Sequence, residues 1–177
     1  MKILINGQFV DISHLAPMQC RMDLNVIGGK IKKNALLEFR FSNHCYSRGQ
    51  KDGEIIPDGM LVTDGLRKRI FCQIRHSLSC NLAQHINDLV SENRMVEKSR
   101  HLNFFSTTMV SPTGVEIPYY VFMRPQKKQD INQPPKIDIH VESAYHHDDP
   151  SIPTPTSIGA PQRLSVVLGD VWSKPTR

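Results

Sequence analysis

Hydrophobic and polar residues alternate most regularly in residues 136–145, which read KIDIHVESAY. Successive side chains of a β-strand point to opposite faces, so this alternation predicts a strand with one apolar and one polar face. The predicted apolar face carries Ile137, Ile139, Val141, Ser143 and Tyr145. The predicted polar face carries Asp138, His140, Glu142 and Ala144. An imidazole and two carboxylates would therefore lie side by side on the polar face.

Two segments before this strand, residues 102–110 and 115–124, are rich in β-branched and aromatic residues and also predict strands. Residues 112–114 (PTG) between them are typical of a tight turn, and polar residues 125–135 make the next connection. Short connections favour antiparallel neighbours. The sequence thus predicts a three-stranded antiparallel β-meander.

One main helix is predicted upstream of the meander. Leu82, Ile86, Leu89 and Val90 recur at i, i+4, i+7 and i+8, which places them on one face of a helix. Ser79 precedes them and is a favourable N-cap residue. We expect this helix to pack against the meander. Residues 69–76 fit either a strand or a helix, and we favour the strand.

The N-terminal part predicts a β-hairpin, because residues 2–5 and 8–12 flank Asn6-Gly7, the dipeptide most typical of a two-residue hairpin turn. Residues 35–42 (ALLEFRFS) predict a further strand. The expected fold class is α+β: a single domain with an antiparallel β-meander packed against one main helix, and an N-terminal β-hairpin.

Three regions follow from the same patterns. We expect an α+β domain over residues 1–147 and a proline-rich linker over residues 148–162. Residues 163–177 would complete the chain. Their apolar start, residues 163–168, predicts either an edge strand of the sheet or a tail that docks on a partner by strand addition.

Composition restricts the class of protein. The chain has 177 residues, enough for one domain with its own core, and no apolar run approaches the length that spans a bilayer. The N-terminal residues lack the apolar core of a secretory signal. The four cysteines lack CxxC spacing, which argues against a disulfide framework and a zinc ribbon. We expect a cytoplasmic protein that does not enter a membrane.

The net charge of +5 comes largely from clustered basic residues, which favour a polyanionic partner. That partner would be RNA, another nucleic acid or an acidic protein; alternatively, the excess lysines serve solubility alone. The residues expected to contact nucleic acid are Arg67, Lys68, Arg69, Lys127 and Lys128.

Cleavage of RNA without a metal needs a base for the 2′-hydroxyl proton, an acid for the leaving oxygen, and cations for the phosphate. His140 and Glu142 on the predicted polar face are candidates for the acid–base pair. Arg124 and Arg75 are candidates for holding phosphate. The alternative is that this face is simply solvated, as one face of an antiparallel sheet commonly is.

A second candidate, His44, lies in the cluster of residues 43–48 (NHCYSR) at the end of a predicted strand. Adjacent side chains of an extended backbone point apart, so His44 and Cys45 do not form a nucleophile pair there. His44 either contributes to the phosphate site or caps backbone groups structurally. A third cluster, residues 146–149 (HHDD), could add metal ligands, but its spacing matches no metal motif, and we expect neither a metal nor another cofactor.

A helix followed by an antiparallel meander in a small basic chain resembles the RelE-like and barnase-like small endoribonucleases, which include many bacterial toxins. The likeness covers residues 79–145 in element order and charge, without a shared residue motif. It implies a metal-independent endoribonuclease of toxin type with an antitoxin-like partner. The segments RFSNHCYS and VESAY are also similar to those of a family of small bacterial proteins, a likeness that implies no mechanism.

The alternative is a non-catalytic interaction protein of a mobile-element or defence system that binds nucleic acid or an acidic protein. Residues 163–172 would then be its docking peptide, with Trp172 as the aromatic anchor. The two hypotheses differ in whether His140 takes part in chemistry.

Overall fold

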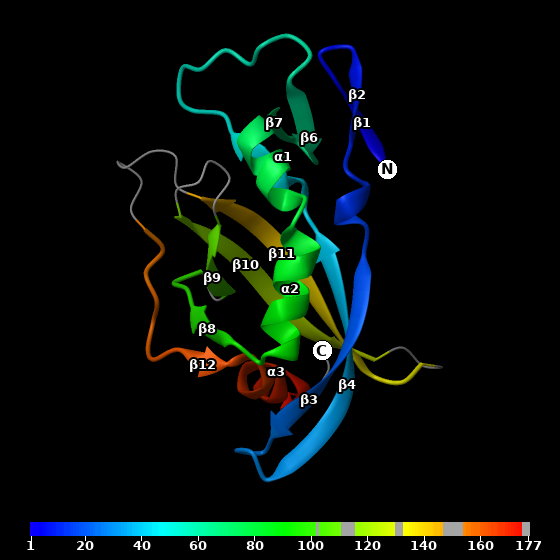
Figure 1. Cartoon of the computed structure of the whole chain (residues 1–177), viewed down its shortest axis with the longest axis vertical. Helices are drawn as coiled ribbons and strands as arrows, with labels where there is room; N and C mark the ends of the chain where they lie inside the picture. Colours follow the sequence, from blue (N-terminus) through cyan, green and yellow to red (C-terminus); the bar gives the residue numbers. More distant parts are fainter. Residues whose placement is uncertain (102, 111–115, 130–132, 147–153, 175–177) are drawn as a thin grey trace.

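A curled sheet forms the centre of the structure (Figure 1). The computed structural model describes residues 1–101, 103–110, 116–129, 133–146 and 154–174, and within them this sheet has seven strands in the order β12-β8-β9-β10-β11-β4-β3. In chain order they are β3 (Met18–Val26), β4 (Ile31–Phe41), β8 (Met95–Lys98), β9 (Phe104–Val110), β10 (Ile117–Lys128), β11 (Lys136–His146) and β12 (Gln162–Arg163). The helices are α1 (Gln73–Ser79), α2 (Leu82–Ser91) and α3 (Leu164–Ser173). The mixed α+β class is confirmed.

Two smaller sheets lie at the upper end in Figure 1. The N-terminal hairpin of β1 (Lys2–Ile5) and β2 (Gln8–Asp11) is confirmed, with Asn6 and Gly7 at φ of 49° and 73° in its turn. Both values lie in the left-handed region, as a type I′ turn requires. The second sheet joins β5 (Ser47–Gly49), β6 (Leu61–Asp64) and β7 (Arg67–Phe71) in the order β5-β7-β6. Short 3₁₀ turns η1 (Ser13–Leu15) and η2 (Asn43–Cys45) connect these parts to the central sheet.

The predicted meander is confirmed, because β9, β10 and β11 are antiparallel neighbours. The turn predicted at residues 112–114 lies outside the described residues. Next to the meander, β4 runs parallel to β11, with Phe39 opposite Ile139, and β3 pairs with β4. Strand β4, from the N-terminal part of the chain, thus extends the sheet formed by the meander, which comes from the later part of the chain.

Helix α2 is the predicted helix, and its stripe Leu82, Ile86, Leu89 and Val90 is buried in the core. Its N-cap is Asn81, whereas Ser79 belongs to α1. The predicted strand over residues 69–76 is wrong in its second half. Strand β7 ends at Phe71, and α1 begins at Gln73. The alternating apolar residues of this segment favoured a strand. Ile74 is 48% exposed, however, so no buried apolar face continues beyond β7.

The prediction of an edge strand or docking tail at residues 163–168 is also wrong. Only Gln162 and Arg163 pair with β8, and the chain then forms α3. Leu164, Val167 and Leu168 have helical spacing and are buried in the same core as the sheet. The helix packs so closely on β3 that a Cβ atom at Gly169 would lie 2.0 Å from the carbonyl oxygen of Asn25. Residues 163–172 are therefore part of the folded domain.

Among the described residues, no helix is both long and apolar enough to cross a membrane.

Candidate functional site

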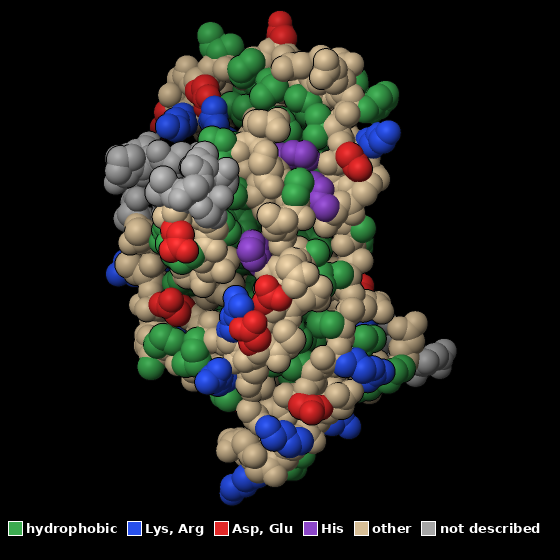
Figure 2. All heavy atoms as spheres, in the orientation of Figure 1, with side chains coloured by type: hydrophobic (Ala, Val, Ile, Leu, Met, Phe, Trp, Pro, Cys, Tyr) green, Lys and Arg blue, Asp and Glu red, His purple; other side chains and the backbone are tan. Residues whose placement is uncertain are grey.

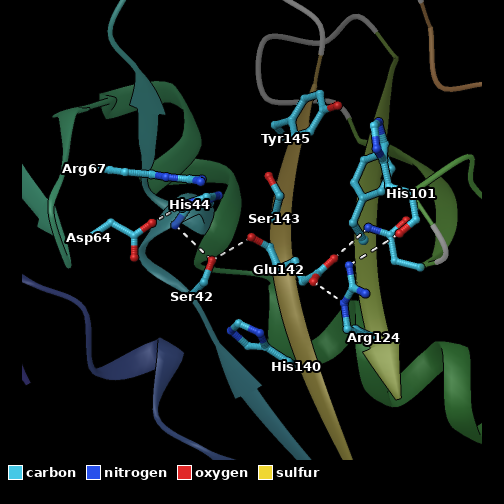
Figure 3. A pocket seen from close by; sticks show the side chains of 12 residues that line it. Ser42, His44, Asp64, Arg67, His101, Arg124, His140, Glu142, Ser143 and Tyr145 are labelled. Carbon is cyan, nitrogen blue, oxygen red and sulfur yellow. Dashed lines mark hydrogen bonds and ion pairs between the residues drawn. The ribbon is translucent and has the colours of Figure 1, made fainter. Parts of the chain in front are cut away.

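A pocket of about 610 Å³ opens on the face of the central sheet that points away from α2. Its position follows from β10: Val121 lines a small cavity with Ile86 and Leu89 of α2, and the next residue, Phe122, points to the opposite face and lines the pocket. The pocket is lined by Ser42, His44, Asp64, Arg67, His101, Asn103, Phe122, Arg124, His140, Glu142, Ser143 and Tyr145 (Figure 3).

A β-bulge in β11 determines which residues reach this pocket. Ser143 pairs with Phe122 and Val141 pairs with Met123, so Glu142 is the extra residue of the bulged strand. The alternation reverses beyond the bulge. Ala144, predicted on the polar face, is buried, while Tyr145, predicted on the apolar face, lines the pocket. Ser143 also lines the pocket. The predicted faces of residues 136–145 are thus correct up to Val141 and wrong for these three residues.

One wall of the pocket carries a histidine–aspartate pair. Nε2 of His44 lies 2.8 Å from Oδ2 of Asp64, the last residue of β6 and 20 positions further along the chain. The hydrogen bond from His44 lowers the pKa of the Asp64 carboxyl, so the carboxylate is ionised at neutral pH and only accepts. His44 must therefore donate from Nε2, and its neutral ring keeps the lone pair on Nδ1.

The protonation state of His44 is set by its surroundings. Burial lowers the pKa of His44, Asp64 opposes this, and the net shift is downward. Two hydrogen bonds fix the backbone position from which the ring of His44 extends. The N–H of His44 donates to the Ser42 hydroxyl, which in turn donates to the carbonyl of Glu142 in β11. His44 is thus a neutral, oriented imidazole attached to the sheet.

On the other wall of the pocket, Glu142 holds the side chain of Arg124 in place. Nε of Arg124 donates to Oε1 of Glu142, and Nδ2 of Asn103 donates to Oε2 at 2.7 Å (Figure 3). Partial burial would raise the pKa of Glu142, but these hydrogen bonds lower it overall. Glu142 is therefore an ionised carboxylate with both oxygens engaged. The predicted acid–base role of Glu142 does not fit this arrangement, because a group with a depressed pKa and two donors is poorly suited to exchange protons near neutral pH.

Asn103 is itself held by the loop between β8 and β9. It is buried, its side-chain oxygen accepts from the Ser99 hydroxyl, and its carbonyl accepts from the Ser99 N–H at 2.9 Å. The N–H of His101 donates to the same hydroxyl. This closed loop presents His101 at the pocket, and the carbonyl of His101 accepts a long hydrogen bond from Arg124.

His140 and Arg67 complete the charged lining. His140 is exposed, and its imidazole makes no hydrogen bond with any described residue. Figure 3 shows Arg67 extending from β7 toward His44 on the opposite side of the pocket from Arg124. The guanidinium of Arg67 likewise makes no hydrogen bond or ion pair within the described part of the chain. The pocket thus brings three imidazoles and two guanidinium groups together.

Four of the predicted catalytic residues, His140, Glu142, Arg124 and His44, line this one pocket. Arg75 does not line it. Its guanidinium donates to the carbonyls of His44 and Ser47 and lies 4.7 Å from the centre of the Tyr145 ring. Arg75 supports η2 from behind and is a positioning residue.

The residues predicted to contact nucleic acid are dispersed. Of the five, only Arg67 lines the pocket. Arg69 donates to the hydroxyl and the carbonyl of Ser47, Lys128 forms an ion pair with Asp138, and Nζ of Lys127 lies 5.4 Å from the Trp172 ring. Basic side chains also gather at the lower end of the molecule in Figure 2, the end at which Figure 1 shows the turn between β3 and β4. Lys30, Lys32 and Lys33, in and just after this turn, are exposed.

Sequence reasoning missed several lining residues. Asp64 and His101 are separated from their partners by loops, and no local pattern marks them. Asn103 carries no sequence signal beyond its place next to a strand. No group of three His, Cys, Asp or Glu residues suited to a metal ion occurs in the described ranges, and residues 147–149 of the third cluster lie outside them. The four cysteines are free thiols.

Comparisons with known proteins give one result. No curated protein matches the chain, and no solved structure matches it. The model of the YjaZ family matches residues 2–172, which is nearly the whole chain and includes every residue of the pocket. The chain therefore belongs to the YjaZ family.

Proposed function

We propose that this protein is a metal-independent endoribonuclease whose active site is the pocket between His44 and Arg124. One observation carries the proposal: an oriented, neutral histidine, a second exposed histidine and two arginines from different walls line a single pocket. Metal-independent cleavage of RNA needs these groups, namely a base, an acid and fixed cations.

The roles follow from the hydrogen bonds. His44 is the base, because Asp64 holds it with the lone pair on Nδ1 and burial keeps it neutral. It takes the proton of the 2′-hydroxyl as that oxygen attacks phosphorus. The bond from phosphorus to the 5′-oxygen breaks, and His140, in its protonated form, donates a proton to that oxygen. The products are a 2′,3′-cyclic phosphate end and a 5′-hydroxyl end.

Arg67 and Arg124 stabilise the charge that develops on the phosphate oxygens. Glu142 and Asn103 take no part in proton transfer. They fix the direction of the Arg124 guanidinium, and a group that is oriented in advance stabilises a transition state without reorganising.

The test is incubation of the purified protein with cellular RNA, with and without EDTA, and analysis of fragments and their ends. We expect EDTA-resistant cleavage that yields cyclic phosphate ends. His44→Ala and His140→Ala should each reduce the rate by about 100-fold or more while circular dichroism stays unchanged. His76→Gln is the matched control, since His76 lies outside the pocket and bonds the carbonyl of Asp11.

Intact RNA with the wild type would overturn the proposal and favour the non-catalytic interaction protein. Variants that test that alternative must leave the folded domain intact. Truncation before Arg163 would remove α3 from the core, and charge reversal at Arg69 would break its bonds to Ser47. Arg67→Glu and Lys68→Glu leave both intact and test the binding of a polyanion.

A further inference from the structure

Two aromatic rings form part of the pocket, although the rest of its lining is mostly charged or polar. Phe122 of β10 and Tyr145 of β11 are both partly exposed there. Their neighbours on the same face, Phe105 and Tyr120, are only 1% and 7% exposed. Large apolar side chains left open within a polar pocket indicate a ligand with an apolar surface of its own.

The two rings are held in a fixed arrangement. Their planes differ by 11°, and their centroids lie 5.6 Å apart. Phe105, the buried residue opposite Phe122 on β9, contacts it with ring centroids 5.3 Å apart, and the guanidinium of Arg75 lies on the Tyr145 ring. Because aromatic side chains have only two side-chain torsions and these contacts restrict them, a ligand would lose little free energy in ordering the rings.

The β-bulge is what makes this aromatic surface. If β11 continued past Val141 without the bulge, strict alternation would turn Tyr145 to the core and place Glu142 and Ala144 on the face of Phe122. With it, Tyr145 stands next to Phe122 on the face that also carries His140 and Arg124. The same irregularity therefore brings aromatic surface and phosphate-binding cations into one pocket.

We infer that Phe122 and Tyr145 stack an unpaired nucleobase, so that the ligand of this pocket is single-stranded nucleic acid. A nucleotide combines a planar base with a phosphate, which matches aromatic rings beside Arg67 and Arg124. A sugar phosphate or a phosphorylated peptide would contact the cations but supplies no planar base to stack on the rings. A base within a duplex is stacked on both faces and is not available to the rings. The inference rests on the proposed function only in placing the phosphate in the same pocket.

The experiment measures binding separately from cleavage. The probes are a 2′-O-methyl oligonucleotide, which lacks the attacking hydroxyl, the same sequence as a duplex, and inorganic polyphosphate, which has no bases. Phe122→Leu keeps an apolar side chain of similar size and removes the ring. Phe9→Leu is the matched control, because Phe9 is 74% exposed on the N-terminal hairpin and does not line the pocket.

Phe122→Leu should weaken binding of the single strand by about 5- to 100-fold, the range for loss of one base–aromatic stack, and leave polyphosphate binding within about twofold. Phe9→Leu should change neither. The wild type should prefer the single strand to the duplex. Equal binding of all three probes, or wild-type affinity in Phe122→Leu, would overturn the inference. A wild type that binds as expected but does not cleave unmodified RNA would refute the nuclease proposal and leave the stacking site intact.

Discussion

Nε2 of His44 in η2 and Oδ2 of Asp64 in β6 lie 2.8 Å apart. Their pairing joins the end of the central sheet to the small β5-β7-β6 sheet and fixes the tautomer of the imidazole. Orientation by a carboxylate is a common way to prepare a histidine for proton transfer. The pair is therefore the first contact that mutagenesis should break.

Asp64→Asn should lower the pKa of His44 further. The negative charge and the hydrogen bond of Asp64 are what raise that pKa against the effect of burial, and the amide supplies no charge. The measurement is an NMR titration of the imidazole resonances, with His14 as the internal reference. RNA cleavage should fall by about 100-fold, since the amide also permits the wrong tautomer. An unchanged His44 titration would show that the pair is not formed in solution.

Glu142→Gln tests whether Glu142 exchanges protons or orients Arg124. The amide can still accept from Asn103, but it loses the charge that holds the guanidinium. We expect cleavage to fall by about tenfold, with both limbs of the pH–rate profile retained. Loss of one limb would assign the acid or the base to Glu142 itself. Glu92→Gln is the control, because it breaks an ion pair with Arg94 outside the pocket.

The same carboxyl contributes to acid stability. The pKa of Glu142 is lowered from 4.5 in the folded protein, so the folded state binds fewer protons than the unfolded state. Its contribution is fully present above about pH 4.5 and decreases as the pH falls through the folded pKa. Urea unfolding between about pH 6 and pH 3 should therefore show a shallower loss of stability in Glu142→Gln than in the wild type. Identical slopes would contradict the depressed pKa.

Local patterns were enough to predict the hairpin at Asn6-Gly7, the stripe of α2 and the three strands of the meander. Each depends on residues that are neighbours in sequence. The parallel pairing of β4 with β11 and the packing of α3 on β3 join segments far apart in the chain, so no local period encodes them. Residues 163–168 show the limit: four apolar positions fit a short strand as well as one turn of helix, and only the buried surface of β3 decides between them.

The same limit explains why the site was predicted only in part. His140, Glu142, Arg124 and His44 were identified by residue type on predicted strands and at a strand end. The roles of Glu142 and Arg75 could not be predicted, because they depend on Asn103 and on the carbonyls of His44 and Ser47. The faces of β11 failed after Val141, since a bulge changes the period by one residue and leaves no mark in composition.

Stability should also fall on mild acidification, through His14. Burial and the neighbouring His76 lower the pKa of His14 from 6.5, so the folded state favours the neutral ring. Its Nε2 donates to the Ser79 hydroxyl, which itself donates to the carbonyl of His76. Stability is then fully present above about pH 6.5 and is lost as the pH falls below it.

Chemical unfolding at about pH 7.5 and pH 5.5 measures this effect. Burial shifts His44 and His85 in the same direction, so the wild type should lose stability overall. His14→Gln keeps a donor for Ser79 without a titrating ring, and it should reduce the loss. If His14→Gln loses as much stability between the two pH values as the wild type does, the effect comes from His44 and His85 instead.

Gly169→Ala tests the packing of α3 on β3. In an exposed helix this change stabilises by about 1 kcal/mol, because alanine has the higher helix propensity. At Gly169 the new Cβ would lie 2.0 Å from the carbonyl oxygen of Asn25, a backbone atom that cannot rotate away. The helix must then move off the strand and separate Leu168 from the core, so we expect a loss of about 2–3 kcal/mol in the free energy of unfolding. Asp170→Ala, at the exposed next position, should change it by less than about 0.5 kcal/mol. If Gly169→Ala proved stabilising instead, α3 could not lie against β3 as closely as the structure places it.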